Sequence, residues 1–336
     1  MFSKWLDRWD ERRAARGEVN KDKTDFELGS VLCFPDAKQG KSFQAFCDLS
    51  ENAAKKPTFF DEPICAKNDF SRHGEWLEYS SEVVTDVDSN NTVRSKFTDG
   101  GGDHALLVLH QWNAIKRQSQ LATFFSRRGI TVVEMALPYH LERSRPGSSY
   151  ADYMLSPNVG LTLQSVKQAV LDGRKAIRYL KSLGYEKISV VGFSLGSWIA
   201  GLIAAHDPTV TKCSLFLSGG SLADMVWTGR ATHHIQESIA PHMDLVDLRR
   251  AWAPINLENY AERLARPELS LQLVLAKRDT VVLPSLSRQL VTRLIIAGAK
   301  PDVIELNCGH YSISKPPFIL MAGRQLQRLL ASTEIR

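Results

Sequence analysis

The chain has 336 residues, of which 43% are hydrophobic and 24% are charged, and its formal net charge is only +5. These values are ordinary for a globular protein and exclude global disorder, and the length suffices for one large domain with an insertion. The basic residues are scattered rather than collected in one run, so composition gives no argument for nucleic-acid binding.

The cysteine pattern and the first residues indicate a compartment. Five cysteines, an odd number, show neither a CxxC pair nor metal-ligand spacing, which favours free thiols in a reducing environment. The start, MFSKWLDRWDERRAARG, is charged throughout and lacks the apolar core of a secretory signal. No apolar run approaches the roughly 20 residues that cross a bilayer. We therefore expect a cytoplasmic location.

Residues 1–16 form a predicted amphipathic helix with two open interpretations. Phe2, Trp5, Leu6 and Trp9 share one helix face, with basic residues nearby. This stripe either packs on the body of the protein, which we favour, or docks on a membrane surface. Residues 18–75 show no sustained period, and we expect irregular structure there with one helix near 41–56. Residues 1–75 are treated as an N-terminal extension.

From residue 76 the pattern becomes regular. Two strand-like runs, EWLEYSSEVV and TVRSKF, predict an antiparallel hairpin. Apolar strands then alternate with helices, which is typical of a mostly parallel sheet covered by helices on both faces. The expected strands are 105–110, 130–137, 188–192, 213–218, 269–276 and 302–307, and the expected helices are 114–128, 160–183, one from 196, 284–298 and one from 316.

The strongest motif is Gly192-Phe193-Ser194-Leu195-Gly196. A G-x-S-x-G match is weak alone, but here it directly follows an apolar strand and opens a helix rich in small residues, as a nucleophile elbow requires. Ser194 must sit on a tight turn so that its hydroxyl projects above the sheet, and the two glycines leave room across that turn. We expect Ser194 to be a nucleophile.

An acid and a histidine follow the serine in the order of an alpha/beta-hydrolase triad. Asp279 comes directly after the predicted strand LQLVLA, and His310 directly after VIELN. Of the nine histidines, His310 is the one that follows the last predicted strand and has a glycine before it. We expect His310 to act as general base and Asp279 to orient it.

These three motifs, GFSLG, RDTVVLP and NCGHYS, give residues 76 to 331 a resemblance to the alpha/beta-hydrolase superfamily, in its esterase, lipase and dienelactone-hydrolase-like branches. The resemblance implies an α/β fold with a mostly parallel twisted sheet, antiparallel strands at its N-terminal edge, and a domain over 76–336. The stretch 219–268 resembles the helical cap insertion of that family. Within it, Trp227 is a candidate for substrate binding.

The resemblance also implies an oxyanion hole made of two backbone N–H groups. One belongs to Leu195, the residue after the nucleophile. The other is expected in LVLHQWNA, from Trp112 or, failing that, from Gln111, which stands where the family usually has glycine. His110 is interpreted as a loop anchor rather than a base.

Two further predictions concern charged residues near the site. Arg143 and Arg145 lie in a loop above the sheet edge, where Arg143 is a candidate to bind a substrate anion, although such arginines more often hold loop backbone. His233 and His234 are adjacent and therefore suit joint metal binding poorly, so we expect no metal.

The predicted function is cleavage of a small-molecule carboxylic ester through an acyl-enzyme, without a cofactor. Thioesterase action and membrane-peripheral lipid deacylation use the same machinery and stay open. A catalytically silent binding protein is a third class, which usually lacks one member of the triad.

Overall fold

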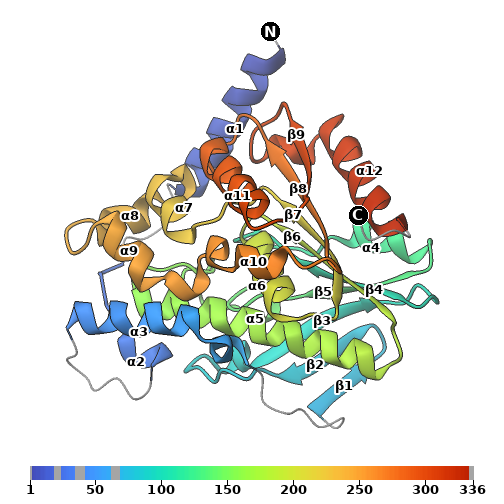
Figure 1. Ribbon diagram of the computed structural model, residues 1–336, viewed down its shortest axis with the longest axis horizontal. Coiled ribbons are helices and arrows are strands. Elements are labelled where there is room, and N and C mark those ends of the chain that lie inside the picture. Colours follow the sequence, from blue (N-terminus) through green and yellow to red (C-terminus); the bar gives the residue numbers. More distant parts are fainter. Residues whose placement is uncertain (1, 19–23, 35–41, 62–68, 333–336) are drawn as a thin grey trace.

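The computed structural model describes residues 2–18, 24–34, 42–61 and 69–332. In these residues, nine strands form one sheet in the order β1-β2-β3-β5-β4-β6-β7-β8-β9 (Figure 1). The strands are β1 (Phe70–His73), β2 (Trp76–Ser80), β3 (Thr92–Thr98), β4 (His104–Leu109), β5 (Ile130–Met135), β6 (Lys187–Phe193), β7 (Val210–Phe216), β8 (Ser270–Ala276) and β9 (Asp302–Leu306).

The sheet is antiparallel at one edge and parallel elsewhere. β1, β2 and β3 pair antiparallel, and β3 joins β5 in the same sense. All pairings from β5 through β4, β6, β7 and β8 to β9 are parallel. β4, β5 and β8 are buried along their whole length, as expected for apolar strands covered on both faces. The predicted hairpin and the predicted parallel sheet are therefore confirmed.

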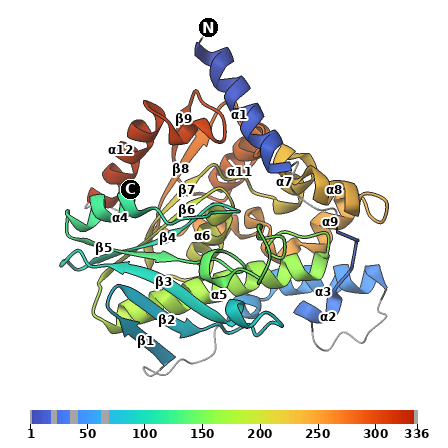
Figure 2. The same cartoon turned by 180° about the vertical axis from the view of Figure 1, so that it is seen from behind.

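Helices cover both faces of the sheet (Figures 1 and 2). One apolar cluster joins the sheet to α5 and α6, and the cluster on the other face joins it to α4 and α12. The helices are α1 (Phe2–Glu18), α2 (Ser30–Cys33), α3 (Phe43–Lys55), α4 (Ser119–Ser126), α5 (Val159–Ser182), α6 (Leu195–His206), α7 (Leu222–Thr228), α8 (His233–Ile239), α9 (Leu245–Ala251), α10 (Ala261–Leu264), α11 (Pro284–Ile296) and α12 (Phe318–Ala331).

A helical insertion separates β7 from β8. It contains α7, α8, α9 and α10 with short 3-10 turns between them, in the stretch where the sequence predicted a cap. The N-terminal helix α3 packs against α9 of this insertion, and Phe46 and Cys47 of α3 are fully buried. The N-terminal segment therefore shares one apolar core with the rest of the chain.

Three elements differ from the sequence prediction. The short helix α2 lies in the stretch 18–75, where only one helix near 41–56 was expected. Strand β1 lies in the stretch that was expected to be irregular, where its short exposed sequence FSRH shows no apolar alternation. Helix α4 begins at Ser119 rather than near residue 114, because the preceding residues form a loop in which Asn113 has a positive φ of 56°.

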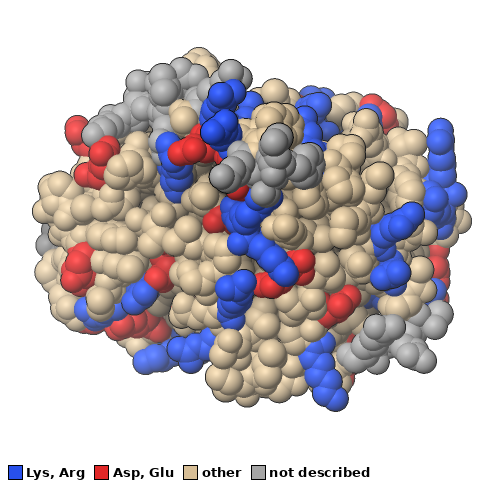
Figure 3. Space-filling view, turned by 90° about the horizontal axis from the view of Figure 1, so that it is seen from above, with Lys and Arg blue, Asp and Glu red and all other residues tan. Residues whose placement is uncertain are grey.

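No helix among the described residues is long and apolar enough to cross a membrane. The face seen from above in Figure 3, on the side from which α1 projects in Figure 1, carries Lys and Arg interspersed with Asp and Glu. Charges of both signs are therefore mixed on this face.

Candidate active site

Ser194 occupies the turn between β6 and α6. Its backbone has φ 51° and ψ −120°, a combination that side-chain-bearing residues rarely adopt. The turn is fixed on both sides, because the Ser194 N–H donates to Phe216 O at 2.9 Å and its carbonyl accepts the Ser197 N–H at 2.7 Å. These bonds hold the strained backbone in place and present the Ser194 side chain at the carboxyl edge of the sheet.

The two glycines of the motif are sterically required. A Cβ on Gly192 would lie 2.0 Å from the carbonyl oxygen of Gly196. A Cβ on Gly196 would lie 2.4 Å from Leu109 O and 2.5 Å from His110 O. The elbow is therefore closed so tightly that only glycine fits at either position, and the loop after β4 lies directly against it.

The structure brings the three predicted residues together. His310 Nε2 lies 3.0 Å from Ser194 Oγ, and His310 Nδ1 lies 2.7 Å from Asp279 Oδ2. Asp279 and His310 are both buried, whereas the Ser194 residue is partly exposed. The arrangement connects a hydroxyl, an imidazole and a carboxylate in one hydrogen-bonded series.

The Asp279 carboxylate is oriented by its own loop. Its second oxygen, Oδ1, accepts the N–H groups of Val281 at 2.8 Å and Val282 at 2.9 Å. These bonds leave Oδ2 directed at His310. The local sequence DTVV after β8 thus folds into a turn that fixes which oxygen faces the histidine.

The loop after β4 carries the residues predicted to complete an oxyanion hole. Leu195 is the first residue of α6, so its N–H has no acceptor within the helix. The Trp112 N–H lies between two fixed points of the backbone: the Gln111 carbonyl, bonded to His110, and the Asn113 N–H, bonded to His140. Because His110 O packs against Gly196, this loop adjoins the start of α6.

Two buried histidines anchor that loop. His110 donates from Nδ1 to Gln111 O at 2.9 Å and accepts the Leu137 N–H at Nε2 at 3.1 Å. His140 donates from Nδ1 to Pro138 O at 2.8 Å and accepts the Asn113 N–H at Nε2 at 2.9 Å. Burial lowers the pKa of His110 to about 4 and that of His140 well below its usual value. Both rings are therefore neutral, and His110 is a loop anchor as expected.

The prediction that Arg143 binds a substrate anion is wrong. Arg143 is fully buried, and its guanidinium donates to Asn90 O at 2.7 Å and to Ala136 O at 3.0 Å. It also pairs with Asp172 Oδ2 of α5 at 2.9 Å. Burial raises the pKa of the Asp172 carboxyl, and Arg143 opposes that shift. The guanidinium thus holds the loop that presents His140.

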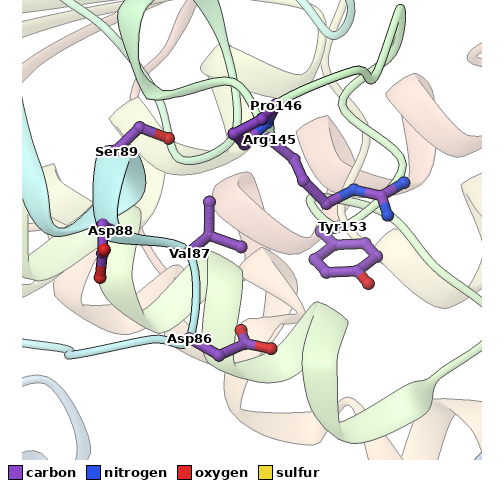
Figure 4. A pocket seen from close by; sticks show the side chains of 7 residues that line it. All are labelled: Asp86, Val87, Asp88, Ser89, Arg145, Pro146 and Tyr153. Carbon is purple, nitrogen blue, oxygen red and sulfur yellow. The ribbon is translucent and has the colours of Figure 1, made fainter.

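A surface hollow beside that loop does not include the triad (Figure 4). It is lined by Asp86, Val87, Asp88, Ser89, Arg145, Pro146 and Tyr153. Arg145 pairs with Asp152 at 2.8 Å, and its guanidinium lies 4.5 Å from the centre of the Tyr153 ring. The second arginine predicted above the sheet edge is therefore engaged by its own loop.

One residue of the insertion, His234, contacts the Trp112 loop. The Trp112 ring stacks on His234 of α8 with a centroid distance of 6.2 Å, and its indole N–H donates to Ala151 O. Trp227 lies on α7, half-buried against the main core, and its role in substrate binding stays a prediction. Among the described residues, no three His, Cys, Asp or Glu side chains are grouped to hold a metal.

Asp10 lies beside the triad and was not predicted from the sequence. It lies on α1, and its buried carboxylate contacts the loop of His310. Leu6, Asp10 and Ala14 are spaced four residues apart and all are buried. The available signal was an acidic residue on the same helix face as two apolar residues. A carboxylate on a buried face needs a hydrogen-bond partner elsewhere in the chain. Packing of α1 on the body is therefore confirmed, but through Leu6, Asp10 and Ala14 and not through the whole predicted stripe, since Trp5 is 58% exposed and the side chain of Phe2 lies outside the described part of the chain. Membrane binding through α1 stays a prediction.

Comparison with known proteins identifies the fold. No protein-family model matches the chain, and no curated protein matches it in sequence. Among solved structures, an acetyl xylan esterase from Thermoanaerobacterium is 15% identical, with a TM-score of 0.58 over 92% of this chain and 100% of that one. An esterase from Pyrococcus furiosus is 16% identical, with a TM-score of 0.54 over 81% and 98%.

A third solved structure, a puromycin-hydrolyzing peptidase from Mycobacterium tuberculosis, is 12% identical, with a TM-score of 0.59 over 77% of this chain and 46% of that one. At these identities the likeness concerns the fold alone. Together with the strand order and the mixed sheet, it shows that the chain has the alpha/beta-hydrolase fold. The chemistry has to be argued from the site.

Proposed function

We propose that this chain is a serine hydrolase that cleaves carboxylic esters through an acyl-enzyme intermediate. The observation that carries the proposal is the series of two hydrogen bonds from Ser194 Oγ to His310 and from His310 to Asp279. In this role the neutral imidazole donates its Nδ1–H to Asp279 and accepts the serine proton at Nε2. The carboxylate stabilises the imidazolium that then forms.

The reaction proceeds in two halves. Ser194 Oγ attacks the ester carbonyl carbon while His310 takes its proton, and the resulting tetrahedral species collapses when His310 returns that proton to the departing alcohol. Water, deprotonated by His310, then attacks the acyl-serine, and the acid leaves as Ser194 recovers its proton. Every proton is accounted for by the imidazole, so this route requires no cofactor or metal.

Two backbone N–H groups would stabilise the negative oxygen of each tetrahedral species. We assign one to Leu195 at the positive end of the α6 dipole, and the other to Trp112, with Gln111 as the alternative. Each such donor contributes roughly 2.7–4 kcal/mol to the transition state. The anchoring of the loop by His110 and His140 supports this assignment, because a donor must be fixed before charge develops.

An ester is the substrate class that we propose, in line with two structures of the same fold, both esterases, that match over 98–100% of their own length. Amide cleavage by the same triad is a further outcome of the test, since one peptidase also shares the fold. Thioester cleavage and lipid deacylation follow the same steps and differ only in what the enzyme accommodates around Ser194. Rates measured on a series of substrates therefore distinguish these two activities from the hydrolysis of small esters.

The test is hydrolysis of p-nitrophenyl esters of increasing acyl length by the full chain and by Ser194→Ala. We expect turnover by the native protein and a loss in kcat of at least about 10³-fold in the variant. A steep preference for long acyl chains would indicate a lipid deacylase. Faster hydrolysis of a thioester with the same acyl group would indicate a thioesterase. Near-normal turnover by Ser194→Ala would contradict the proposed mechanism, and complete inactivity of the native chain would favour a silent binding protein.

A further inference from the structure

Helix α1, the first element of the chain, reaches the loop that carries His310. Asp10 lies within α1 and is only 4% exposed. Its Oδ1 accepts the N–H of Tyr311 at 2.7 Å and the N–H of Ser312 at 3.0 Å. These two residues directly follow His310, and Ser312 begins the turn η8 (Ser312–Ser314). A carboxylate 301 positions away in sequence thus caps the turn after the histidine.

The residue before His310 contacts the same carboxylate. A Cβ on Gly309 would lie 2.5 Å from Asp10 Oδ2, so glycine is what allows the carboxylate to approach the loop. The Gly309 N–H donates to Ser312 Oγ at 2.9 Å. The backbone on both sides of His310 is therefore held by a unit formed by Asp10 and Ser312.

Helix α1 is itself fixed to both loops that carry triad residues. Leu6 is buried in the apolar cluster that contains Leu306 and Cys308, at the end of β9. Asp7 pairs with Arg278, the residue before Asp279, at 3.0 Å. The N–H of Arg278 in turn donates to Cys308 O at 3.0 Å. Figures 1 and 2 show α1 crossing the end of the sheet beside α7.

We propose that Asp10 is a positioning residue for the catalytic histidine, an inference that rests on the proposed function. The imidazole must lie within hydrogen-bond distance of two partners at once, and a displacement of about 1 Å costs on the order of 10²-fold in rate. A carboxylate that accepts two backbone N–H groups makes stronger bonds than a neutral acceptor. Asp10 thereby fixes the loop while it touches neither substrate nor the reacting atoms.

Three variants of α1 test this role with p-nitrophenyl acetate. Asp10→Ala removes the acceptor, and we expect kcat to fall about 10- to 100-fold with KM within about 2-fold of native. Asp10→Asn keeps an oxygen at the Oδ1 position and should retain kcat within about 3-fold of native. Glu11→Ala, which removes an exposed carboxylate from the same helix, is the matched control and should behave as the native protein.

A readout independent of turnover separates this proposal from the proposed function. The proton NMR resonance of His310 Nδ1–H, hydrogen-bonded to Asp279 in the native protein, should shift or broaden in Asp10→Ala but not in Glu11→Ala. If the native chain hydrolyses no ester and this resonance still changes, the proposed function fails while the positioning role stands. An active native chain whose Asp10→Ala variant keeps both kcat and the resonance would overturn the positioning role.

A second position guards against an Asp10→Ala variant that does not fold. Gly309→Ala keeps Asp10 but places a methyl group 2.5 Å from its carboxylate, so the loop must move. We expect a kcat loss of about 10-fold or more at unchanged KM in a variant that retains its native circular dichroism. A folded Gly309→Ala variant with normal kcat and an unaltered His310 resonance would also overturn the positioning role.

Discussion

The Oγ atom of Ser194 lies 3.0 Å from Nε2 of His310, although 116 positions separate the two residues in the chain. Ser194 reaches this point through a backbone conformation, φ 51° and ψ −120°, that is costly for any residue with a side chain. His310 reaches it through a loop held by hydrogen bonds at Gly309, Tyr311 and Ser312. A strained backbone thus positions the Ser194 hydroxyl, and a hydrogen-bonded loop positions the His310 imidazole next to it.

The strained backbone at Ser194 predicts that a glycine variant is more stable than an alanine variant at this position, which is the reverse of their order inside a helix. Ser194→Gly should be more stable than Ser194→Ala by about 1 kcal/mol, because glycine adopts this conformation without a Cβ clash. Urea unfolding of both variants measures the difference. Ser197, inside α6, is the control, since Ser197→Gly there should be less stable than Ser197→Ala by about 1 kcal/mol. If Ser194→Ala and Ser194→Gly have the same free energy of unfolding, the backbone at this position is not strained.

Asp279→Asn should lower kcat by about 10²–10⁴-fold while the fold is retained. The amide keeps the shape of the carboxylate but favours the wrong histidine tautomer and cannot stabilise the imidazolium. Steady-state kinetics with p-nitrophenyl acetate measures the loss. Asp302→Asn, at the start of β9 and bonded to Gln272, is the control and should turn over normally. A harmless Asp279→Asn would mean that another carboxylate is the acid.

Acid should destabilise the fold through its buried histidines. Burial lowers the pKa of His110 and of His206 to about 4. Between pH 6.5 and about 4 the unfolded chain therefore binds more protons at these positions than the native state does. The free energy of unfolding should consequently fall as pH falls through this window, by up to about 1.4 kcal/mol per pH unit for each such histidine.

Urea titrations at several pH values measure that slope. His206 packs against Phe60 and Tyr260, remote in sequence from the triad residues, and therefore offers a selective test. His206→Gln should flatten the dependence by up to about 1.4 kcal/mol per pH unit within the window. An unchanged slope in this variant would show that His206 is not held neutral by the fold.

Helix α1 should contribute to stability as well as to the site. Leu6 is 1% exposed, and Leu6→Ala should lower the free energy of unfolding by about 2–5 kcal/mol. Trp5, which is 58% exposed, is the comparison, and Trp5→Ala should cost far less. Deletion of residues 1–16 should likewise lower the melting temperature. A deletion variant of native stability that no longer sediments with anionic liposomes would favour membrane docking instead.

Features that depend on short local patterns were predictable from the sequence. The apolar run of β6, the two glycines around Ser194 and the small residues of α6 together define a strand, a turn and a helix between Lys187 and His206. Asp279 and His310 were found because each follows an apolar strand, and parallel strands end at one edge of the sheet.

Features that depend on distant partners were not predictable. That Arg143 holds loop backbone was the favoured alternative, but its ion pair was not predictable, because nothing in its own loop indicates the buried Asp172 on α5. The early part of the expected helix 114–128 is a loop. It follows Asn113, which has a positive φ of 56° and whose N–H donates to His140 on a different connection. Asp10 was seen only as part of a charged helix, because its acceptor role requires a turn at the other end of the chain.

The most direct test of the central claim is covalent labelling with a fluorophosphonate, followed by intact-mass and peptide mass spectrometry. This reagent phosphonylates a serine whose hydroxyl is activated by a neighbouring base. We expect one adduct per chain on the peptide that contains Ser194, strongly slowed labelling in His310→Ala, and none in Ser194→Ala. A native chain that takes up no label, or that carries it on a different serine, would contradict the assignment of Ser194 as the nucleophile.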